Sequence, residues 1–320
     1  MPQTTQTKRP RSAKIKPRPI RFYRTLLLYI LLGTIAVLLL TVVILAVSKG
    51  SVKKELQAET EKVHTLTAQI QALQNTPAGS FFKEDIGKDY PYTKEYPDLY
   101  VEPIQPSPID ENQKIAYLSF DDGPSVLTAE FLDVLKEKGV KATFFVVGQE
   151  LDTYADLLRR AVDEGHCIGI HSDSHDYEEI YASVDAYLQD FNRIFERVTE
   201  ITGQKPNIFR FPGGSINAYN DSIYQRLVAE MTRRGFTYYD WTVDSGDAGY
   251  SPNVEQMMEN INWSTEVYIA PVVLMHDARS KRLTVDTLPQ IIDAYQQAGF
   301  TFDTLDHRVP CYFPYKNDSK

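Results

Sequence analysis

The pattern of apolar and polar positions divides the chain into three parts. Residues 25–47 form an apolar run of 23 residues without a charged side chain. Between residues 52 and 73, apolar side chains recur at alternating steps of three and four, which is the spacing of a helical seam. From residue 113 onward, short apolar runs alternate with amphipathic segments of helical length. This alternation predicts an α/β domain over residues 113–306.

Each apolar run and each amphipathic segment of this domain predicts one element. We expect strands at 115–120, 142–147, 166–170, 207–211, 236–240, 270–275 and 300–303, and helices at 127–138, 152–164, 184–201, 221–234, 254–261 and 286–298. Strands that alternate with helices build a mainly parallel sheet wrapped by helices. In barrels of this kind the chemistry lies at the carboxyl ends of the strands.

The apolar run at 25–47 has the length of a membrane span. At about 1.5 Å per residue it can cross a hydrocarbon core of about 30 Å, so we expect an uncleaved transmembrane helix. A cleaved signal peptide that ends near Ala46-Val47-Ser48 is the alternative. Residues 1–24 carry eight basic and no acidic side chains. This bias predicts a single-pass protein of the cell membrane, with a cytoplasmic basic tail and the domain at 113–306 on the extracellular side.

Two segments connect the predicted span to the domain. Residues 48–76 are expected to form a helical stalk, in which a coiled coil between two copies and a single solvated helix are both open. Residues 77–112 are rich in proline, which indicates an extended linker or a cover over the following domain. Residues 307–320 are expected to form a C-terminal tail.

The charge of the chain bears on its binding partners, and its cysteines bear on disulfide formation. The chain has a net charge of −9 although its first 24 residues are strongly basic, so the remainder is acidic and nucleic acid is not an expected partner. The cysteines are Cys167 and Cys311, for which a disulfide and free thiols are both open. His166 and His307 are expected to be structural or surface residues.

Two adjacent carboxylates, Asp121 and Asp122, stand where a predicted strand meets Gly123-Pro124. A plain polar turn is one interpretation. On a bent backbone, however, the two side chains can hold different partners, a metal ion for one and a proton for the other. His171 and His175 follow another predicted strand and would share one face if that segment forms a helical turn. Two histidines and one carboxylate leave open positions on zinc or a similar ion.

These residues belong to five motifs in order along the chain. They are Ser119–Pro124, His171–His175, Arg210–Gly214, Asp240–Asp247 and Leu274–His276. Together they resemble the motifs of the polysaccharide deacetylases, also called the NodB-homology domain or carbohydrate esterase family 4. The resemblance covers about residues 113–306. It implies a distorted (β/α)7 barrel, here preceded by a transmembrane helix and a helical stalk.

The resemblance also implies roles for individual residues. Asp122, His171 and His175 would hold one divalent ion, zinc first and cobalt, manganese or nickel as alternatives. Asp121 would act as the base, and Arg210 would pair with it. His276 would protonate the leaving amine, supported by Asp247, with Asp244 and Asp240 as alternatives.

The expected substrate site lies around the same motifs. Gly213 would offer a backbone N–H to the oxyanion, and Trp241 and Leu274 would line the site. Gly213 stands where the family commonly has an aromatic residue, and Ala248 where a tryptophan often follows the aspartate; Tyr219, Tyr250 and Trp241 could serve as stacking surfaces instead.

The activity implied is N-deacetylation of N-acetylglucosamine units in a cell-wall polysaccharide, with peptidoglycan as the first expectation. Alternatives are another polymer, such as an exopolysaccharide, a chitin-like glycan or acetylated xylan, and a non-catalytic wall-binding scaffold.

Overall fold

The computed structural model describes residues 90–313 of the 320-residue chain. The predicted basic tail, transmembrane helix and stalk, and the first part of the predicted linker, lie outside the described residues. Within 90–313, no helix combines the length and the apolar character needed to cross a membrane.

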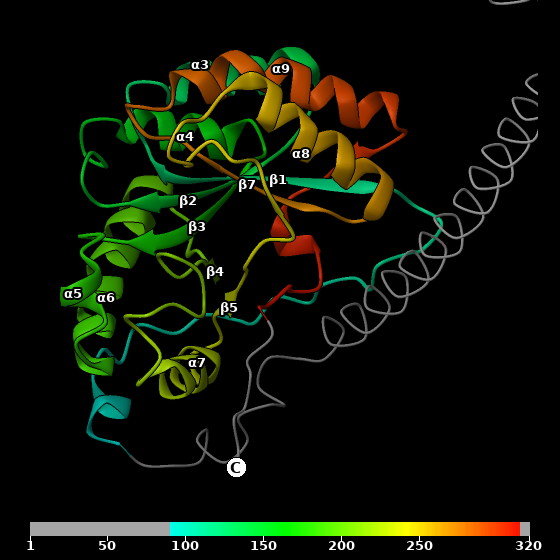
Figure 1. Ribbon diagram of the computed structural model, residues 1–320. Helices are drawn as coiled ribbons and strands as arrows, with labels where there is room; N and C mark the ends of the chain where they lie inside the picture. Colours follow the sequence, from blue (N-terminus) through cyan, green and yellow to red (C-terminus); the bar gives the residue numbers. More distant parts are fainter. Residues whose placement is uncertain (1–89, 314–320) are drawn as a thin grey trace, which may run out of the picture. The chain divides into compact units, whose positions relative to one another are not determined.

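A parallel sheet forms the centre of the domain (Figure 1). Its strands are β1 (Ile115–Gly123), β2 (Thr143–Val147), β3 (Cys167–Ser172), β4 (Ile208–Phe209), β5 (Thr237–Tyr238), β6 (Val243–Asp244), β7 (Val272–His276) and β8 (Thr301–Phe302). They follow the order β5-β4-β3-β2-β1-β7-β6, and β8 pairs with the start of β1. In the described part of the chain β5 and β6 do not pair with each other, so the sheet is a curled, open version of the predicted barrel.

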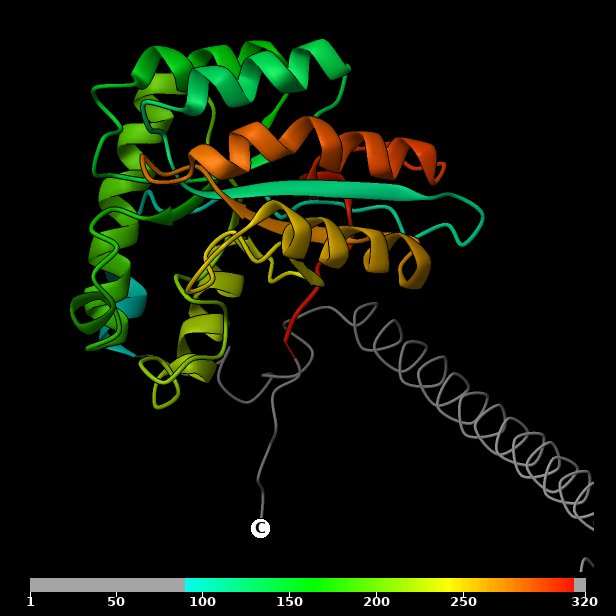
Figure 2. The same ribbon diagram turned by 45° about the horizontal axis from the view of Figure 1, so that its top comes forward.

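Helices cover the outside of the sheet. They are α3 (Thr128–Lys138), α4 (Ala155–Asp163), α5 (Tyr177–Ile180), α6 (Val184–Thr202), α7 (Tyr224–Arg233), α8 (Val254–Val267) and α9 (Arg282–Gln297), with short 3-10 helices η2 (Pro91–Lys94) and η3 (Leu305–His307). Neighbouring helices touch in the order α8, α9, α3, α4, α6, α5. Figure 2 shows α9 between α3 and α8. The predicted alternation of strands and helices is confirmed.

Some element boundaries differ from the prediction because tertiary contacts decide them. Helix α8 continues to Val267 instead of ending at residue 261. Ser264 lies in this extension, and its hydroxyl is 2.5 Å from the hydroxyl of Tyr295 on α9. This buried contact fixes the last turn of α8, and no periodic pattern in α8 itself could reveal it. Strand β6 and helix α5 were not predicted; with two and four residues, they are too short to show a period.

Side chains alternate between the two faces of the sheet along β4 and the residues directly after it, and this alternation sets the direction of Arg210. Phe209 and Phe211 face the helices, where Phe209 packs against Phe191 of α6 with ring centroids 5.5 Å apart. Arg210 lies between them in sequence and therefore points to the other side of the sheet. There its guanidinium lies 4.3 Å from the centre of the Phe145 ring. The aromatic core thus fixes the strand that carries Arg210.

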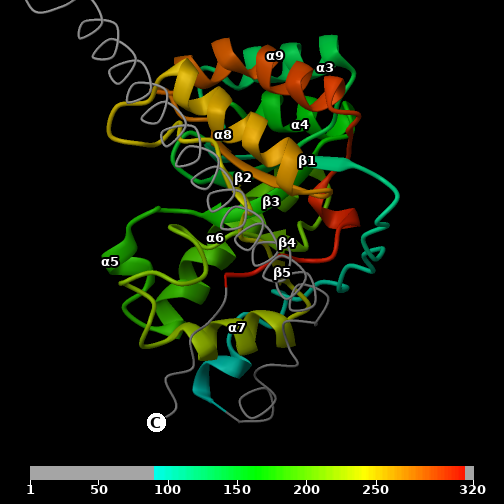
Figure 3. The same ribbon diagram turned by 45° about the vertical axis from the view of Figure 1, so that its right-hand side comes forward.

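Part of the predicted linker packs on the domain. Leu99 is fully buried and Tyr92 nearly so. Arg234, just after α7, donates hydrogen bonds to the carbonyls of Tyr92 and Glu95 at 3.1 and 2.9 Å. The segment 90–101 therefore lies against the end of α7, as Figure 3 shows. It covers the domain, which was one of the two expected arrangements.

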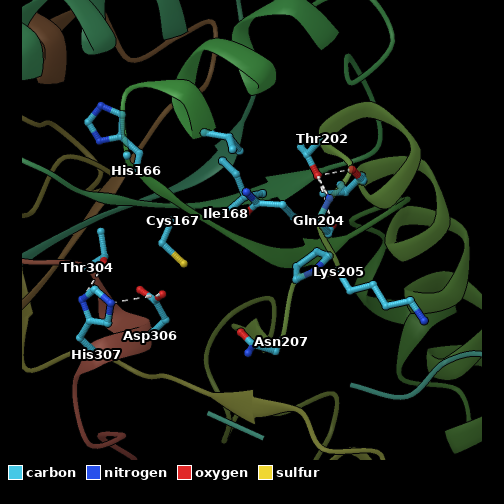
Figure 4. A pocket seen from close by; sticks show the side chains of 14 residues that line it. His166, Cys167, Ile168, Thr202, Gln204, Lys205, Asn207, Thr304, Asp306 and His307 are labelled. Atoms are coloured by element: carbon cyan, nitrogen blue, oxygen red, sulfur yellow. Dashed lines mark hydrogen bonds and ion pairs between the residues drawn. The ribbon is translucent and has the colours of Figure 1, made fainter. Parts of the chain in front are cut away.

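The cysteines are free thiols in the described structure. Cys167 begins β3 and lines a pocket with His166 and His307, among other residues (Figure 4). This pocket lies at the opposite end of β3 from His171. His166 and His307 are thus remote from the predicted site.

Candidate active site

The two aspartates at the end of β1 point to different partners. Strand β1 continues through Gly123, but Asp122 has a φ of 71° and the pairing with β2 shifts between Asp121 and Gly123. Asp121 is buried, and its Oδ1 pairs with Arg210 while its Oδ2 lies 3.8 Å from Nε2 of His171. Asp122 turns toward both His171 and His175 and does not contact Arg210. The sharp bend of the backbone therefore separates two neighbouring carboxylates.

His171 and His175 come together without a helix. The segment does not form the helical turn that was one way to bring the two rings together, because His171 belongs to β3 and His175 lies in a turn with a φ of 58°. The turn is held by Asp190 of α6, which accepts hydrogen bonds from the Ser172 hydroxyl at 2.7 Å and from the Ser174 backbone at 2.8 Å. The two imidazole centroids lie 5.2 Å apart.

Asp122, His171 and His175 fit a metal ion. One ligand atom from each lies within 4.8 Å of the others, and they are the one such group among the described residues. The Nε2 atoms of His171 and His175 lie 3.7 and 3.3 Å from Oδ1 of Asp122. That oxygen is buried and has no hydrogen-bond partner in the described structure. A buried carboxylate oxygen without a donor is costly unless a cation is present.

The tautomer of His171 suits coordination. Its Nδ1 lies 2.7 Å from the carbonyl oxygen of Arg210, so Nδ1 carries the proton and donates it, and Nε2 keeps a lone pair toward Asp122. Burial, with the neighbouring His175, lowers the pKa of His171 to about 3. The ring is therefore neutral near pH 7, as a metal ligand must be.

Asp121 forms a buried ion pair with Arg210. The Nη1 atom of Arg210 lies 2.8 Å from Oδ1 of Asp121 and 2.9 Å from the Ser119 hydroxyl. Its other nitrogens donate to the carbonyls of Tyr239 and Asp240 at 3.0 and 3.1 Å. Burial raises the pKa of Asp121 above its usual value, while the charge of Arg210 opposes this rise. A raised pKa makes this carboxylate a stronger proton acceptor.

Partly buried His276 and buried Asp247 form a second pair at the same edge of the sheet. Nδ1 of His276 lies 2.8 Å from Oδ1 of Asp247, and the backbone N–H of His276 donates to Oδ2 at 2.8 Å. Thr284 donates to Oδ2 at 2.9 Å. Burial opposes the charge on His276, but the hydrogen bond and charge of Asp247 outweigh it and raise the pKa of His276.

Of the three aspartates considered for this contact, only Asp247 touches His276. Asp244 is exposed and accepts from the backbone of Gly246. Asp240 is buried and accepts from Ser215 and from the backbone of Phe313.

Sheet register brings the two pairs together. Asp121 on β1 is the direct pairing partner of His276 on β7. Carboxyl ends of adjacent parallel strands lie at one edge, so the Asp121–Arg210 pair, the His276–Asp247 pair and the candidate metal-binding group share one site.

The residues predicted to line the substrate site lie around these groups. Gly213 has a φ of 75° in the loop after β4. Trp241 packs edge-on against Phe313, and the Arg210 guanidinium lies 5.7 Å from its ring centre. Leu274 is a buried residue of β7 that pairs with Ser119 and Asp244 in the neighbouring strands.

Sequence reasoning missed Asp277, which supports the end of β1. Its carboxylate accepts from the hydroxyls of Ser125 and Thr128 at 2.8 and 2.5 Å, and its backbone N–H donates to Asp121 at 2.7 Å. A Cβ on Gly123 would lie 2.5 Å from this carboxylate, which explains the glycine there. Burial raises the pKa of Asp277 to about 7. The only hint of this residue in the sequence is that an aspartate directly follows the motif that ends at His276.

Several known proteins are similar to this chain in sequence. The family model described as polysaccharide deacetylase matches residues 109–232. YheN of Bacillus subtilis, provisionally named a polysaccharide deacetylase, is 31% identical over 88% of this chain and 92% of its own length. A peptidoglycan-N-acetylglucosamine deacetylase of Bacillus cereus is 31% identical over 69% of this chain and 79% of its own length.

Solved structures share the fold. The catalytic domain of a peptidoglycan N-acetylglucosamine deacetylase from Eubacterium rectale has a TM-score of 0.61 and 36% identity, over 68% of this chain and 98% of that domain. The polysaccharide deacetylase Bc1974 of Bacillus cereus has a TM-score of 0.54 and 31% identity, over 65% of this chain and 95% of its own. The curled parallel sheet, the Asp-His-His group and these relatives agree, and the chain therefore belongs to the polysaccharide deacetylases of carbohydrate esterase family 4, which are hydrolases.

Proposed function

We propose that this deacetylase removes acetyl groups from N-acetylglucosamine units of peptidoglycan, with zinc as its metal. The proposed chemistry rests on one observation: three groups of side chains lie at the same edge of the sheet. They are the metal-fitting group, Asp122, His171 and His175, and the pairs Asp121–Arg210 and His276–Asp247. Support for peptidoglycan comes from the relatives in Bacillus cereus and Eubacterium rectale that are named for this substrate.

The types of the three candidate ligand residues support zinc as the metal. Two imidazoles and one carboxylate are ligands typical of catalytic zinc sites, which keep a position open for water or substrate. The same donors also accept cobalt, manganese or nickel, so metal replacement is part of the test. A divalent ion at this site polarises a carbonyl and makes water a stronger nucleophile near neutral pH.

Asp121 is the base of the proposed reaction. It accepts a proton from the water whose oxygen attacks the acetyl carbon. Arg210 orients the carboxylate through the 2.8 Å contact and through its own bonds to the backbone. The backbone around Gly213 supplies an N–H to the oxygen that gains negative charge.

His276 is the acid on the opposite side of the reacting group. An amine leaves as a neutral molecule only if its nitrogen receives a proton as the C–N bond breaks. Asp247 raises the pKa of His276, which favours the protonated ring, and the hydrogen bond between them fixes the orientation of that ring. The products are acetate and a glycan with a free amino group.

Acetate release from purified cell-wall material tests this function. The full-length protein should release acetate from peptidoglycan, lose activity in excess chelator and regain it with zinc. Chitin oligosaccharides and acetylated xylan serve as parallel substrates. Faster release from either would replace peptidoglycan as the substrate, and no release from any glycan by the metal-loaded protein would favour a wall-binding scaffold.

We also propose that the protein is anchored in the cell membrane with the catalytic domain outside. The uncharged run at 25–47 and the basic residues that precede it support this topology. The seam between residues 52 and 73 supports pairing of two copies, and the molecular mass of the detergent-solubilised protein tests it.

A further inference from the structure

An aromatic side chain occupies the space above Gly213 although residue 213 has none of its own. An ideal Cβ on Gly213 would lie 2.7 Å from Cε1 and 3.3 Å from the hydroxyl of Tyr177. A side chain at 213 and the ring of Tyr177 in its present position therefore exclude each other. Tyr177 comes from the loop after β3, next to the metal-fitting residues, and not from the loop that carries Gly213.

Tyr177 is held in place by its surroundings. It is the first residue of α5, which Asp176 caps by accepting from the backbone N–H groups of Glu178 and Glu179. At the other end of α5, the hydroxyl of Tyr181 donates to the carbonyl of Pro212 at 2.8 Å. The helix and the loop around Gly213 thus form one unit.

Tyr219 extends the aromatic surface away from the metal-fitting group. The ring of Tyr177 lies 5.3 Å from that of His175 on one side and 5.3 Å from that of Tyr219 on the other. The backbone of Tyr219 donates to the side chain of Asn217, which in turn donates to the carbonyl of Pro212. Tyr219 is therefore fixed to the loop that carries Gly213, to which Tyr181 of α5 is also hydrogen-bonded.

The outer part of this surface faces solvent. Tyr219 is 51% exposed although a large aromatic side chain gains from burial. A sugar ring has one face of C–H groups and a rim of hydroxyls, so it can stack on a tyrosine ring while its hydroxyls remain in water. Rings that are already fixed lose little freedom when a ligand binds.

We propose that Tyr177 and Tyr219 form a subsite for the sugar adjacent to the one that is deacetylated. The proposal rests on the proposed function, and it specifies the substrate as a glycan chain of several units rather than a single amino sugar. Tyr177 supports the subsite from its position beside His175, and Tyr219 supplies the exposed stacking surface.

Oligosaccharides of N-acetylglucosamine with one and with five units test the subsite. In the full-length protein, Tyr219→Ala should lower kcat/KM for the pentasaccharide about 5- to 10-fold, the value of one aromatic contact, mainly through KM. Activity on the monosaccharide should not change. Tyr177→Phe should behave as the wild type because the ring remains, whereas Tyr177→Ala should lose at least as much as Tyr219→Ala.

The matched control is Trp263→Ala, which removes a similarly exposed aromatic ring, at 54%, from α8. Equal losses in this variant, or wild-type kinetics on the pentasaccharide in both Tyr219→Ala and Tyr177→Ala, would overturn the subsite. Metal content of each variant should equal that of the wild type, which separates the subsite from damage to the neighbouring ligands.

Binding separates failure of the subsite from failure of the proposed function. Calorimetry with the pentasaccharide and chelator-treated protein needs no turnover, and Tyr219→Ala should raise the Kd by the same 5- to 10-fold, about the worth of one aromatic contact. If the wild type releases no acetate but this difference in Kd persists, the subsite stands and the proposed reaction fails. If acetate is released and the Kd values are equal, the subsite fails alone.

Discussion

At the scale of single residues, the site depends on a separation of two neighbouring carboxylates. Asp121 faces a permanent cation, whereas Asp122 faces two imidazole nitrogens that are free to bind a metal. The motif Asp-Asp-Gly-Pro allowed a prediction of two different roles. The positive φ of Asp122 is the feature that produces them, and the sequence does not show which of two adjacent aspartates adopts it, although aspartate is enriched in this conformation.

Asn replacements at these two positions should give different results. Asp121→Asn removes a base but no ligand, so the metal should stay while the hydrolytic rate falls roughly 10²- to 10⁴-fold. Asp122→Asn weakens coordination because an amide oxygen is a poorer ligand, so metal content and rate should fall together. Metal analysis and acetate release on both variants check this. Metal lost from the Asp121 variant but kept by the Asp122 variant would reverse the two roles, and full activity in both would reduce the segment to a polar turn.

If His276 donates the proton as proposed, its deprotonation should limit activity at alkaline pH. The hydrogen bond and charge of Asp247 raise the pKa of His276, so the ring keeps its proton to higher pH than a free imidazole. In Asp247→Asn the pKa falls, and the activity that needs protonated His276 should be lost at lower pH. We expect the alkaline limb of kcat/KM to move down by about 1 pH unit or more.

Asp244→Asn is the control for this shift, because Asp244 precedes the same loop but is exposed. Its pH profile should match that of the wild type. An alkaline limb that stays in place in Asp247→Asn would show that another group supplies the proton.

At the scale of elements, the sequence predicted the buried strands and long helices well and the site loops poorly. The run Phe144–Val147 is apolar, short and made only of aromatic and β-branched residues, and together these features favour a buried strand. The turn from His171 to His175 contains serines and aspartate, and its shape depends on Asp190, which lies on a different helix. The local sequence around residues 171–175 does not reveal that Asp190, 15 or more residues away, holds this turn. The sequence therefore left the shape of this turn open, although it indicated His171 and His175 as candidate ligands.

The contact between segment 90–101 and α7 should contribute strongly to stability. Arg234 is fully buried, pairs with Glu230 at 2.7 Å and donates to several backbone carbonyls of this segment. Arg234→Met would leave these acceptors without donors. The free energy of unfolding should fall by about 3 kcal/mol. Denaturant unfolding measures it, with Arg226→Met on the exposed side of α7 as the control, for which a change within about 0.5 kcal/mol is expected. Equal stability of the two variants would mean that the segment is only loosely attached.

At the scale of the whole molecule, the parallel sheet explains why residues far apart in sequence meet. Asp121, His171, Arg210 and His276 come from four strands or the residues just after them. Because all the strands run in the same direction, their carboxyl ends share one edge. The sequence predicted this edge from the order of the elements alone. It did not predict the opening between β5 and β6, because each of these strands has only two residues and their pairing depends on loops on both sides.

The last prediction concerns the membrane topology of the full chain. The proposed action on cell-wall glycan requires a catalytic domain outside the cell, and the charge pattern around residues 25–47 predicts that only the first 24 residues remain in the cytoplasm. With tags at both ends of the chain, a protease added to intact cells should remove the C-terminal tag together with the domain and leave the N-terminal tag protected. Permeabilised cells, in which both tags become accessible, are the control. Loss of the N-terminal tag from intact cells would reverse the orientation. Recovery of the domain in the medium with a new N-terminus near residue 48 would instead show that the apolar run is a cleaved signal, since an uncleaved span of this length keeps the domain on the membrane.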